Sequence, residues 1–185
     1  SWRQNTDVVR MRACAALLSL VIASVNAKNC GLDDVHYHHP DRNDRHHGWH
    51  FDLAGCTELD LSGDLPVPIA GEAVTLLAAA LAQPGIHLKT LQLTGARIAD
   101  VGAIALAKAL ESNRFLTTLM LGKNGIGDKA AVKLGKALTV NTVLTTLSLN
   151  ENPISDAGGA SLAESIKSNR ALTSLDLGDT RIGEA

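Results

Sequence analysis

Hydrophobic and polar positions recur in the same order through the second half of the chain. Four six-residue segments, each with leucine at positions one, four and six, begin at Leu88, Leu116, Leu144 and Leu172. Their starts differ by 116−88, 144−116 and 172−144, which is 28 each time, and a looser copy begins 32 residues earlier (88−56) at Cys56. The alternation at the end of each copy, as in Leu91 and Leu93, predicts a short strand with one apolar face.

A helix is predicted after each strand. Aspartates stand where a helix needs an N-cap, at Asp100, Asp128 and Asp156. Apolar pairs four residues apart then define one helix face: Leu106 and Leu110, Leu134 and Leu138, Leu162 and Ile166. Small residues lie between them, at Ala107, Gly135 and Ala163, and predict closely packed neighbouring helices.

Asparagines follow each predicted helix, at Asn113, Asn141 and Asn169. Asparagine tolerates the left-handed backbone of a helix C-terminus, so we expect that conformation there. A single strand-helix unit cannot bury its apolar face, so neighbouring units must stack. The sequence therefore predicts an α/β solenoid, a curved horseshoe segment with one short parallel strand and one helix per 28-residue repeat.

The pattern L-x-x-L-x-L with a period of about 20–29 residues is the signature of leucine-rich repeats. From Cys56 to the end, the chain resembles the ribonuclease-inhibitor-like class, which is also seen in NOD-like receptors and Ran GTPase-activating proteins. The resemblance implies a ladder of turn asparagines, which Asn124 and Asn152 match. Ala96 and Thr180 occupy the same position in other copies, so the ladder is expected to be partial.

The resemblance also implies that the strands line a concave face. Its outward positions form two columns: Glu58, Thr90, Thr118, Thr146 and Ser174, then Asp60, Gln92, Met120, Ser148 and Asp176. These ten residues are the candidate partner-binding site, with Met120 as the one apolar candidate. Threonine is also typical of a solvated strand, so an ordinary solvated sheet is the alternative.

The favoured function is a non-enzymatic protein-protein interaction module that uses this concave face and needs no cofactor. The first alternative is a GTPase-activating-type regulator of a small GTPase, in which Arg97 or Arg181, in turns after strands, would act on the partner. A metal-binding or hydrolytic enzyme is less consistent with the sequence, which has no nucleophile elbow and no glycine-rich phosphate loop before a helix.

The amino-terminal region has the composition of an export signal. Arg12 follows Met11, an apolar run covers 13–25, and small residues precede a cleavage point after Ala27. The run is shorter than the about 20 residues that span a bilayer, so no membrane span is expected in the mature chain. We expect residues 1–27 to comprise upstream residues and the signal peptide Met11–Ala27, and the protein to be secreted. If this run is a buried helix instead, the protein is cytoplasmic.

Residues 28–55 form a His/Asp-rich linker or N-terminal cap before the repeats of 56–185, which number about four to five with the last truncated. Weak metal candidates in this segment are His36, His38, His39, His46, His47 and His50. Their spacing matches no defined metal site, so no metal site is predicted. After export, Cys30 and Cys56 would be an even pair and a possible disulfide; two buried free thiols are the alternative.

Composition and charge restrict the classes of partner that the protein can bind. The 185 residues include 17 basic and 19 acidic ones, a net charge of −2, which gives no electrostatic case for binding nucleic acid. Hydrophobic residues make up 45% and aromatic residues 3%, so the core must be aliphatic. We expect a monomeric solenoid with a protein partner.

Overall fold

The computed structural model describes residues 56–63 and 71–183. The predicted signal Met11–Ala27, the segment 28–55 with its six histidines, and Cys30 lie outside the described residues. None of the described helices combines the length and the apolar character needed to traverse a membrane.

Strands and helices alternate along the described chain. The order is β1 Glu58–Asp60, α2 Gly71–Leu81, β2 Thr90–Gln92, α3 Ala99–Ser112, β3 Thr118–Met120, α4 Asp128–Val140, β4 Thr146–Ser148, α5 Asp156–Ser168 and β5 Ser174–Asp176. One short strand followed by one helix is the unit that the leucine spacing predicts.

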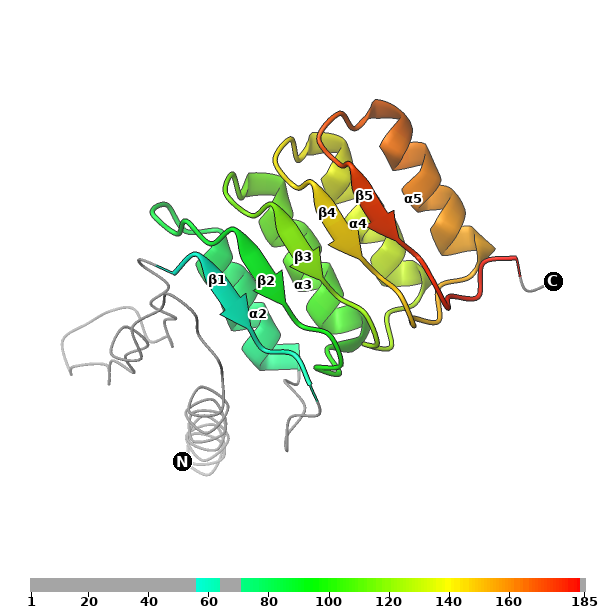
Figure 1. Ribbon diagram of the computed structural model, residues 1–185, viewed down its shortest axis with the longest axis horizontal. Coiled ribbons are helices and arrows are strands. Elements are labelled where there is room, and N and C mark those ends of the chain that lie inside the picture. The colour runs from blue at the N-terminus through cyan, green and yellow to red at the C-terminus, as the bar shows by residue number, and fades with distance from the viewer. Residues whose placement is uncertain (1–55, 64–70, 184–185) are drawn as a thin grey trace, which may run out of the picture.

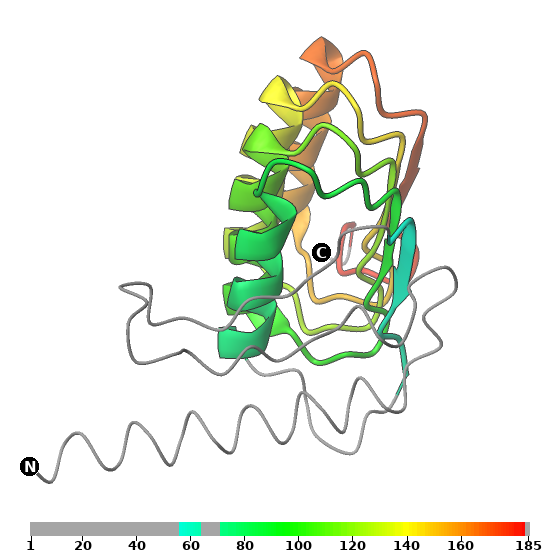
Figure 2. The same cartoon turned by 90° about the vertical axis from the view of Figure 1, so that its left-hand side faces the viewer.

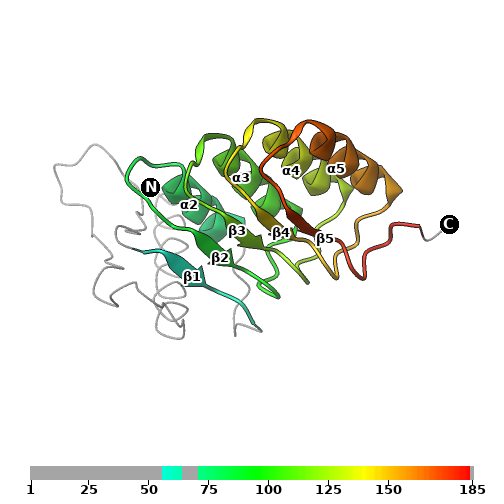
Figure 3. The same cartoon turned by 45° about the horizontal axis from the view of Figure 1, so that its top comes forward.

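The five strands form one parallel sheet in the order β1-β2-β3-β4-β5, so each coil lies beside its neighbours in sequence. Leu91 pairs with Leu119, and Leu119 with Leu147, which is the register of a 28-residue repeat. Leu59 pairs with Leu91 despite the 32-residue spacing of the first copy. The helices cover one face of the sheet, and the coils stack along one axis (Figures 1 and 3). The predicted α/β solenoid is confirmed.

The core lies between the sheet and the helices. Leu91, Leu119 and Leu147 of the strands are fully buried, and Leu106 and Leu134 of the helices meet them from the other layer. Burial of an aliphatic side chain of this size contributes about 1.5–3 kcal/mol. Because neither layer can bury its leucines alone, the stacked coils form one continuous core.

This core becomes more exposed at the last coil. Ile166 belongs to the predicted apolar face of α5 but is 36% exposed. Leu172 and Leu175 are only partly buried, although they pack against the core. No described element covers the outer side of α5 and β5, which explains the exposure of these leucine-repeat positions.

Small residues let neighbouring helices approach one another, as predicted. A Cβ atom on Gly135 would lie 3.1 Å from the main-chain oxygen of Ser161 in the next helix. Ala107 is buried, whereas Ala163 is exposed because α5 has no following helix among the described residues. Small side chains at this position therefore set the helix spacing within the stack.

The prediction that aspartates cap their own helices is wrong. The residues concerned are Asp100, Asp128 and Asp156, which lie in the first turns of α3, α4 and α5. The N-cap positions belong to Ile98, Gly127 and Ser155. Each aspartate instead accepts a main-chain hydrogen bond from the next coil, 27 residues later. Two of these bonds join Gly127 N to Asp100 Oδ1 at 2.7 Å and Gly183 N to Asp156 Oδ1 at 2.8 Å.

Asp128 makes the most extensive of these contacts. Ser155 donates from its hydroxyl to Asp128 Oδ2 at 2.6 Å and from its main-chain N–H to Oδ1 at 2.8 Å, and Gly158 N donates at 3.1 Å. The Ser155 hydroxyl, followed by the Ser155 N–H, lowers the pKa of the Asp128 carboxyl, while desolvation opposes this. The carboxylate of one coil thus caps the helix of the next.

The prediction of left-handed backbone after the helices is also wrong. Asn113, Asn141 and Asn169 have φ values of −67°, −78° and −72° with extended ψ values. The hydrogen bonds of Asn141 explain why asparagine recurs at this position after each helix. Its Nδ2 donates to Leu110 O at 2.7 Å in the preceding coil, and its Oδ1 accepts from Val143 N and Leu144 N at 2.9 and 2.8 Å.

Candidate functional site

The helices lie on one side of the sheet and leave its other face uncovered (Figure 2). Two columns of strand residues flank the central leucines. The first is Glu58, Thr90, Thr118, Thr146 and Ser174; the second is Asp60, Gln92, Met120, Ser148 and Asp176. The leucine in the middle of each strand packs toward the helices, so these flanking residues point to the opposite side. We call these ten residues the open sheet face; the structure brings all of the predicted positions into two aligned rows.

Charge is confined to the two ends of the open sheet face. Glu58 and Asp60 are in β1 and Asp176 is in β5, whereas the positions from β2 to β4 carry no charge. Met120 occupies the centre of the second row, between Gln92 and Ser148, and is partly exposed. The face therefore offers an uncharged centre with one apolar side chain between two acidic ends.

Hydrogen bonds orient the acidic side chains at the β1 end. Gln92 Nε2 donates to Glu58 Oε1 at 3.2 Å across neighbouring strands. The main-chain N–H of Ser62 donates to Asp60 Oδ1 at 2.9 Å. Both residues are partly exposed at this end of the face.

A polar network occupies the β5 end. The Ser148 hydroxyl donates to Asn150 Oδ1 at 2.8 Å or to Asp176 Oδ2 at 3.2 Å. Gly178 N donates to the other oxygen of Asp176 at 3.0 Å. Gly122 leaves the space for this arrangement, because a Cβ atom there would lie 2.1 Å from Asn150 Oδ1.

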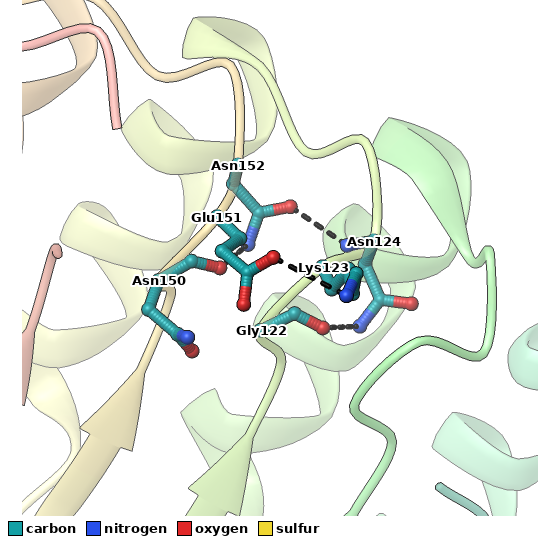
Figure 4. Close-up of polar contacts among 6 residues, drawn as sticks. All are labelled: Gly122, Lys123, Asn124, Asn150, Glu151 and Asn152. Atoms are coloured by element: carbon teal, nitrogen blue, oxygen red, sulfur yellow. Dashed lines mark hydrogen bonds and ion pairs between the residues drawn. The ribbon is translucent and has the colours of Figure 1, made fainter. Parts of the chain in front are cut away.

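The turns at the carboxyl ends of the strands hold the predicted asparagine ladder (Figure 4). Asn152 Oδ1 accepts from Asn124 N at 3.0 Å and from Ile126 N at 2.9 Å, and its Nδ2 donates to Leu121 O at 2.9 Å. Asn124 Oδ1 accepts in turn from Ile98 N at 3.3 Å. The ladder is partial, as predicted, and it fixes the turns beside the open sheet face.

One position in these turns has a left-handed backbone in successive coils, with Gly95, Lys123, Glu151 and Asp179 at φ values of 75°, 59°, 53° and 54°. Lys123 Nζ lies 3.4 Å from Glu151 Oε2, so the turns carry an exposed ion pair between neighbouring coils (Figure 4). An exposed pair of this kind contributes at most about 1 kcal/mol to stability.

A shallow hollow of about 560 Å³ lies beside this turn column in the first coils. Gln92, Arg97 and Lys123 border it, and the absence of side chains at Gly63 and Gly95 leaves it open. Arg97 is exposed at this edge, and Arg181 is exposed in the equivalent turn of the last coil. The two arginines of the GTPase-regulator alternative therefore lie on turns after strands, as expected.

Sequence reasoning missed an exposed aromatic pair. His87 and Phe115 lie in the turns before β2 and β3, with ring centroids 4.4 Å apart and an angle of 68° between the ring planes. Phe115 is 38% exposed. The sequence carries one signal for this pair, since 115−87 is one repeat of 28, but turn residues have no hydrophobic alternation that would mark them.

Of the two cysteines predicted to pair, only one is among the described residues. Cys56 is completely buried, while Cys30 lies outside the described residues, so their disulfide stays a prediction. In the stretches 56–63 and 71–183, no three His, Cys, Asp or Glu residues gather where they could hold a metal ion.

Comparison with known proteins identifies the repeat. The family model described as "Leucine Rich repeat" matches residues 86–107, 112–135 and 140–163. A solved structure titled "Leiomodin-1 Actin-Binding Site 2 (ABS2)" is similar with 27% sequence identity and a TM-score of 0.58, over 65% of this chain and 69% of that chain. A comparison with curated proteins finds no match. The predicted leucine-rich repeats are thereby confirmed, and the ribonuclease-inhibitor-like subclass stays a prediction.

Proposed function

We propose that this chain, which folds as an α/β leucine-rich repeat solenoid, is a non-enzymatic protein-interaction module that binds its partner on the open sheet face. The observation that carries the proposal is the alignment of ten residues on the sheet face that no helix covers, all of them at least partly exposed except Ser148, which is buried. Extended faces of stacked repeats suit a protein partner better than a small molecule, which needs a concave pocket.

The composition of this face supports a partner of particular chemistry. Carboxylates at Glu58, Asp60 and Asp176 favour basic side chains opposite both ends. Threonine and glutamine between them supply hydrogen-bond donors and acceptors, and Met120 supplies an adaptable apolar contact. We propose a partner that presents two basic groups on either side of an uncharged segment.

Actin is the first partner to test, because the similar leiomodin-1 structure is titled as an actin-binding site. The measurement is co-sedimentation of the full chain with actin filaments, together with a direct binding assay on monomeric actin. The test variant is Glu58→Lys/Asp176→Lys, which reverses one charge at each end of the face. A matched control is Glu111→Lys/Glu164→Lys, which makes the same change in net charge at exposed positions of α3 and α5, away from the sheet.

We expect the double variant to bind about tenfold or more weakly, which corresponds to about 1.4 kcal/mol, and the control to bind as the parent does. Equal weakening by both variants would mean that the net charge of the chain, and not the open sheet face, determines the affinity. If the parent does not bind actin, actin is rejected as the partner. In that case, a partner captured from extract serves as the ligand in the same comparison, and its unchanged binding to the double variant rejects the open sheet face.

The compartment decides which partners the protein meets. We propose that Met11–Ala27 directs secretion, whereas actin is an intracellular protein. A reporter of secretion fused after Lys28 distinguishes an exported protein from a cytosolic one. Export of the reporter excludes actin as the native partner and directs the search to extracellular proteins, while cytosolic retention rejects the secretion signal.

A further inference from the structure

The turns that lead from each helix to the next strand form a rim along one edge of the sheet (Figure 1). The turns comprise residues 82–89, 113–117, 141–145 and 169–173. We call them the helix-to-strand rim. Main-chain hydrogen bonds hold them in line, from Thr117 N to Lys89 O, from Thr145 N to Thr117 O and from Thr173 N to Thr145 O, each at 2.9 Å.

One row of this rim is largely apolar. It consists of His87, Phe115, Val143 and Ala171, each 28 residues after the one before. Adjacent strands are about 4.8 Å apart, so the row extends over three such steps. The His87 and Phe115 rings meet edge to face, and both residues are exposed. Aromatic residues are enriched at protein interfaces, so this exposed pair offers an apolar contact to a partner.

The aromatic pair is held in place by its surroundings. Asn113 Oδ1 accepts from Phe115 N at 2.9 Å, so the backbone that carries the ring is fixed. The guanidinium of Arg114 donates to Glu111 O at 3.0 Å and to Asn113 O at 3.1 Å. These contacts reduce the entropy that the turn would lose when a partner binds.

The charges on this rim have one sign. Its four turns contain Lys89, Arg114 and Arg170, all exposed, and no aspartate or glutamate. The last helical turns add one charge of each sign, Glu111 and Lys167. The four turns therefore carry three cations and no anion, and Lys89 and Arg114 share the turns of the aromatic pair, although the whole chain has a net charge of −2.

We propose that the helix-to-strand rim binds an acidic protein segment that packs an aromatic side chain against His87 and Phe115. The cations select negative charge, and the aromatic pair supplies the apolar contact that a purely electrostatic surface lacks. This surface is separate from the open sheet face and goes beyond the function proposed above, so either binding mode can fail without the other.

The probe is a short fluorescein-labelled peptide in which one tryptophan lies between glutamates, titrated against the full chain by fluorescence anisotropy. The chain supplies its own test variant, His87→Ala/Arg114→Thr/Phe115→Val, since Ala171, Thr142 and Val143 occupy these positions in later coils. We expect the triple variant to bind about tenfold or more weakly. Phe115→Val alone is the second variant, should the triple variant unfold at a lower temperature.

Two controls separate this proposal from general attraction to cations. Lys123→Gly removes one cation from the opposite rim, at a position where Gly95 shows that glycine fits, and is expected to leave binding unchanged. A peptide with serine in place of tryptophan should bind about tenfold or more weakly. Equal binding of that peptide, equal binding by Phe115→Val, or tighter binding of an RNA oligonucleotide than of the peptide would each overturn the proposal.

Discussion

Ser155 donates two hydrogen bonds to Asp128 in the preceding coil, from Oγ to Oδ2 at 2.6 Å and from its main-chain N–H to Oδ1 at 2.8 Å. Ser155 is the N-cap residue of α5, and Gly158 in the first turn of that helix donates to the same carboxylate at 3.1 Å. A carboxylate near a helix N-terminus is stabilised by the helix dipole and by these N–H groups. The contact therefore couples the folding of neighbouring coils.

Acid should weaken this coupling. The pKa of Asp128 is lowered in the folded chain, first by the Ser155 hydroxyl, so the folded state binds a proton less readily than the unfolded state. The resulting stability is fully present above the unfolded value of about 4 and is lost as pH falls through the folded pKa. We expect the free energy of unfolding of Asp128→Asn, measured by urea titration from pH 7 to 2, to decrease less with acid than that of the parent.

Asp156→Asn is the matched control for this pH series. Asp156 occupies the same position one repeat later but accepts only the 2.8 Å bond from Gly183 N among the bonds described. The two asparagine variants should therefore differ in their pH dependence, with the larger change at Asp128. Parallel pH curves for the parent and Asp128→Asn would contradict the assigned role of this carboxylate.

Loss of the central turn asparagine should be costly. Asn152 is 2% exposed, and its side chain pairs with Asn124 N, Ile126 N and Leu121 O. Asn152→Ala leaves these buried groups unsatisfied, so we expect a loss of about 2–4 kcal/mol in the free energy of unfolding by urea. Thr180→Ala, at the same position of the last coil, is expected to cost less than about 1 kcal/mol. Equal losses would show that the ladder does not carry the effect.

Much of the fold could be predicted because the repeat makes local and global signals agree. Leucines 28 residues apart set the strand register, and pairs such as Leu106 and Leu110 mark the buried face of each helix. The partners of the polar residues were harder to predict, because capping rules consider only the helix to which each residue belongs. Asp128 and Asn141 instead bond to neighbouring coils, at separations of 27 and 31 residues that no local capping rule considers.

The difference between local and long-range signals also explains which parts of the candidate site could be predicted from the sequence. The rows containing Met120 and Thr118 follow from alternation within a strand. The aromatic pair of His87 and Phe115 lies in turns, where no hydrophobic alternation applies, so its only signal in the sequence is the 28-residue spacing, and the contact follows once the sheet stacks the turns. Similarly, the asymmetric charge of the helix-to-strand rim is absent from the net charge of −2.

A glycine at position 141 distinguishes the observed cap from a left-handed one. In a left-handed C-terminal cap, Asn141→Gly would be tolerated, because glycine adopts positive φ at little cost. With φ at −78°, glycine has no conformational advantage and removes the bonds to Leu110 O, Val143 N and Leu144 N. We expect Asn141→Gly and Asn141→Ala to lose about 2–4 kcal/mol each in urea unfolding. A neutral effect of glycine would refute the extended geometry.

Two adjacent glycines of α5 should respond to alanine in opposite directions. A Cβ atom on Gly158 would lie 2.6 Å from Asp128 Oδ1 and 2.7 Å from Ile154 Cγ2, so Gly158→Ala must displace the carboxylate that caps this helix. Such overpacking costs about 1–3 kcal/mol, and the lost Asp128 contacts add to it, which outweighs the higher helix propensity of alanine.

Gly159→Ala supplies the matched comparison. Its Cβ would approach Ile182 Cδ1 at 2.8 Å, but that atom is the end of a flexible side chain that is 40% exposed and can rotate away. The gain in helix propensity, up to about 1 kcal/mol, should then dominate. Thermal unfolding of the two single variants beside the parent tests the contrast: a lower Tm for Gly158→Ala and an equal or higher Tm for Gly159→Ala. Equal shifts would mean that intrinsic helix propensity, and not the contact between α5 and the preceding coil, decides stability here.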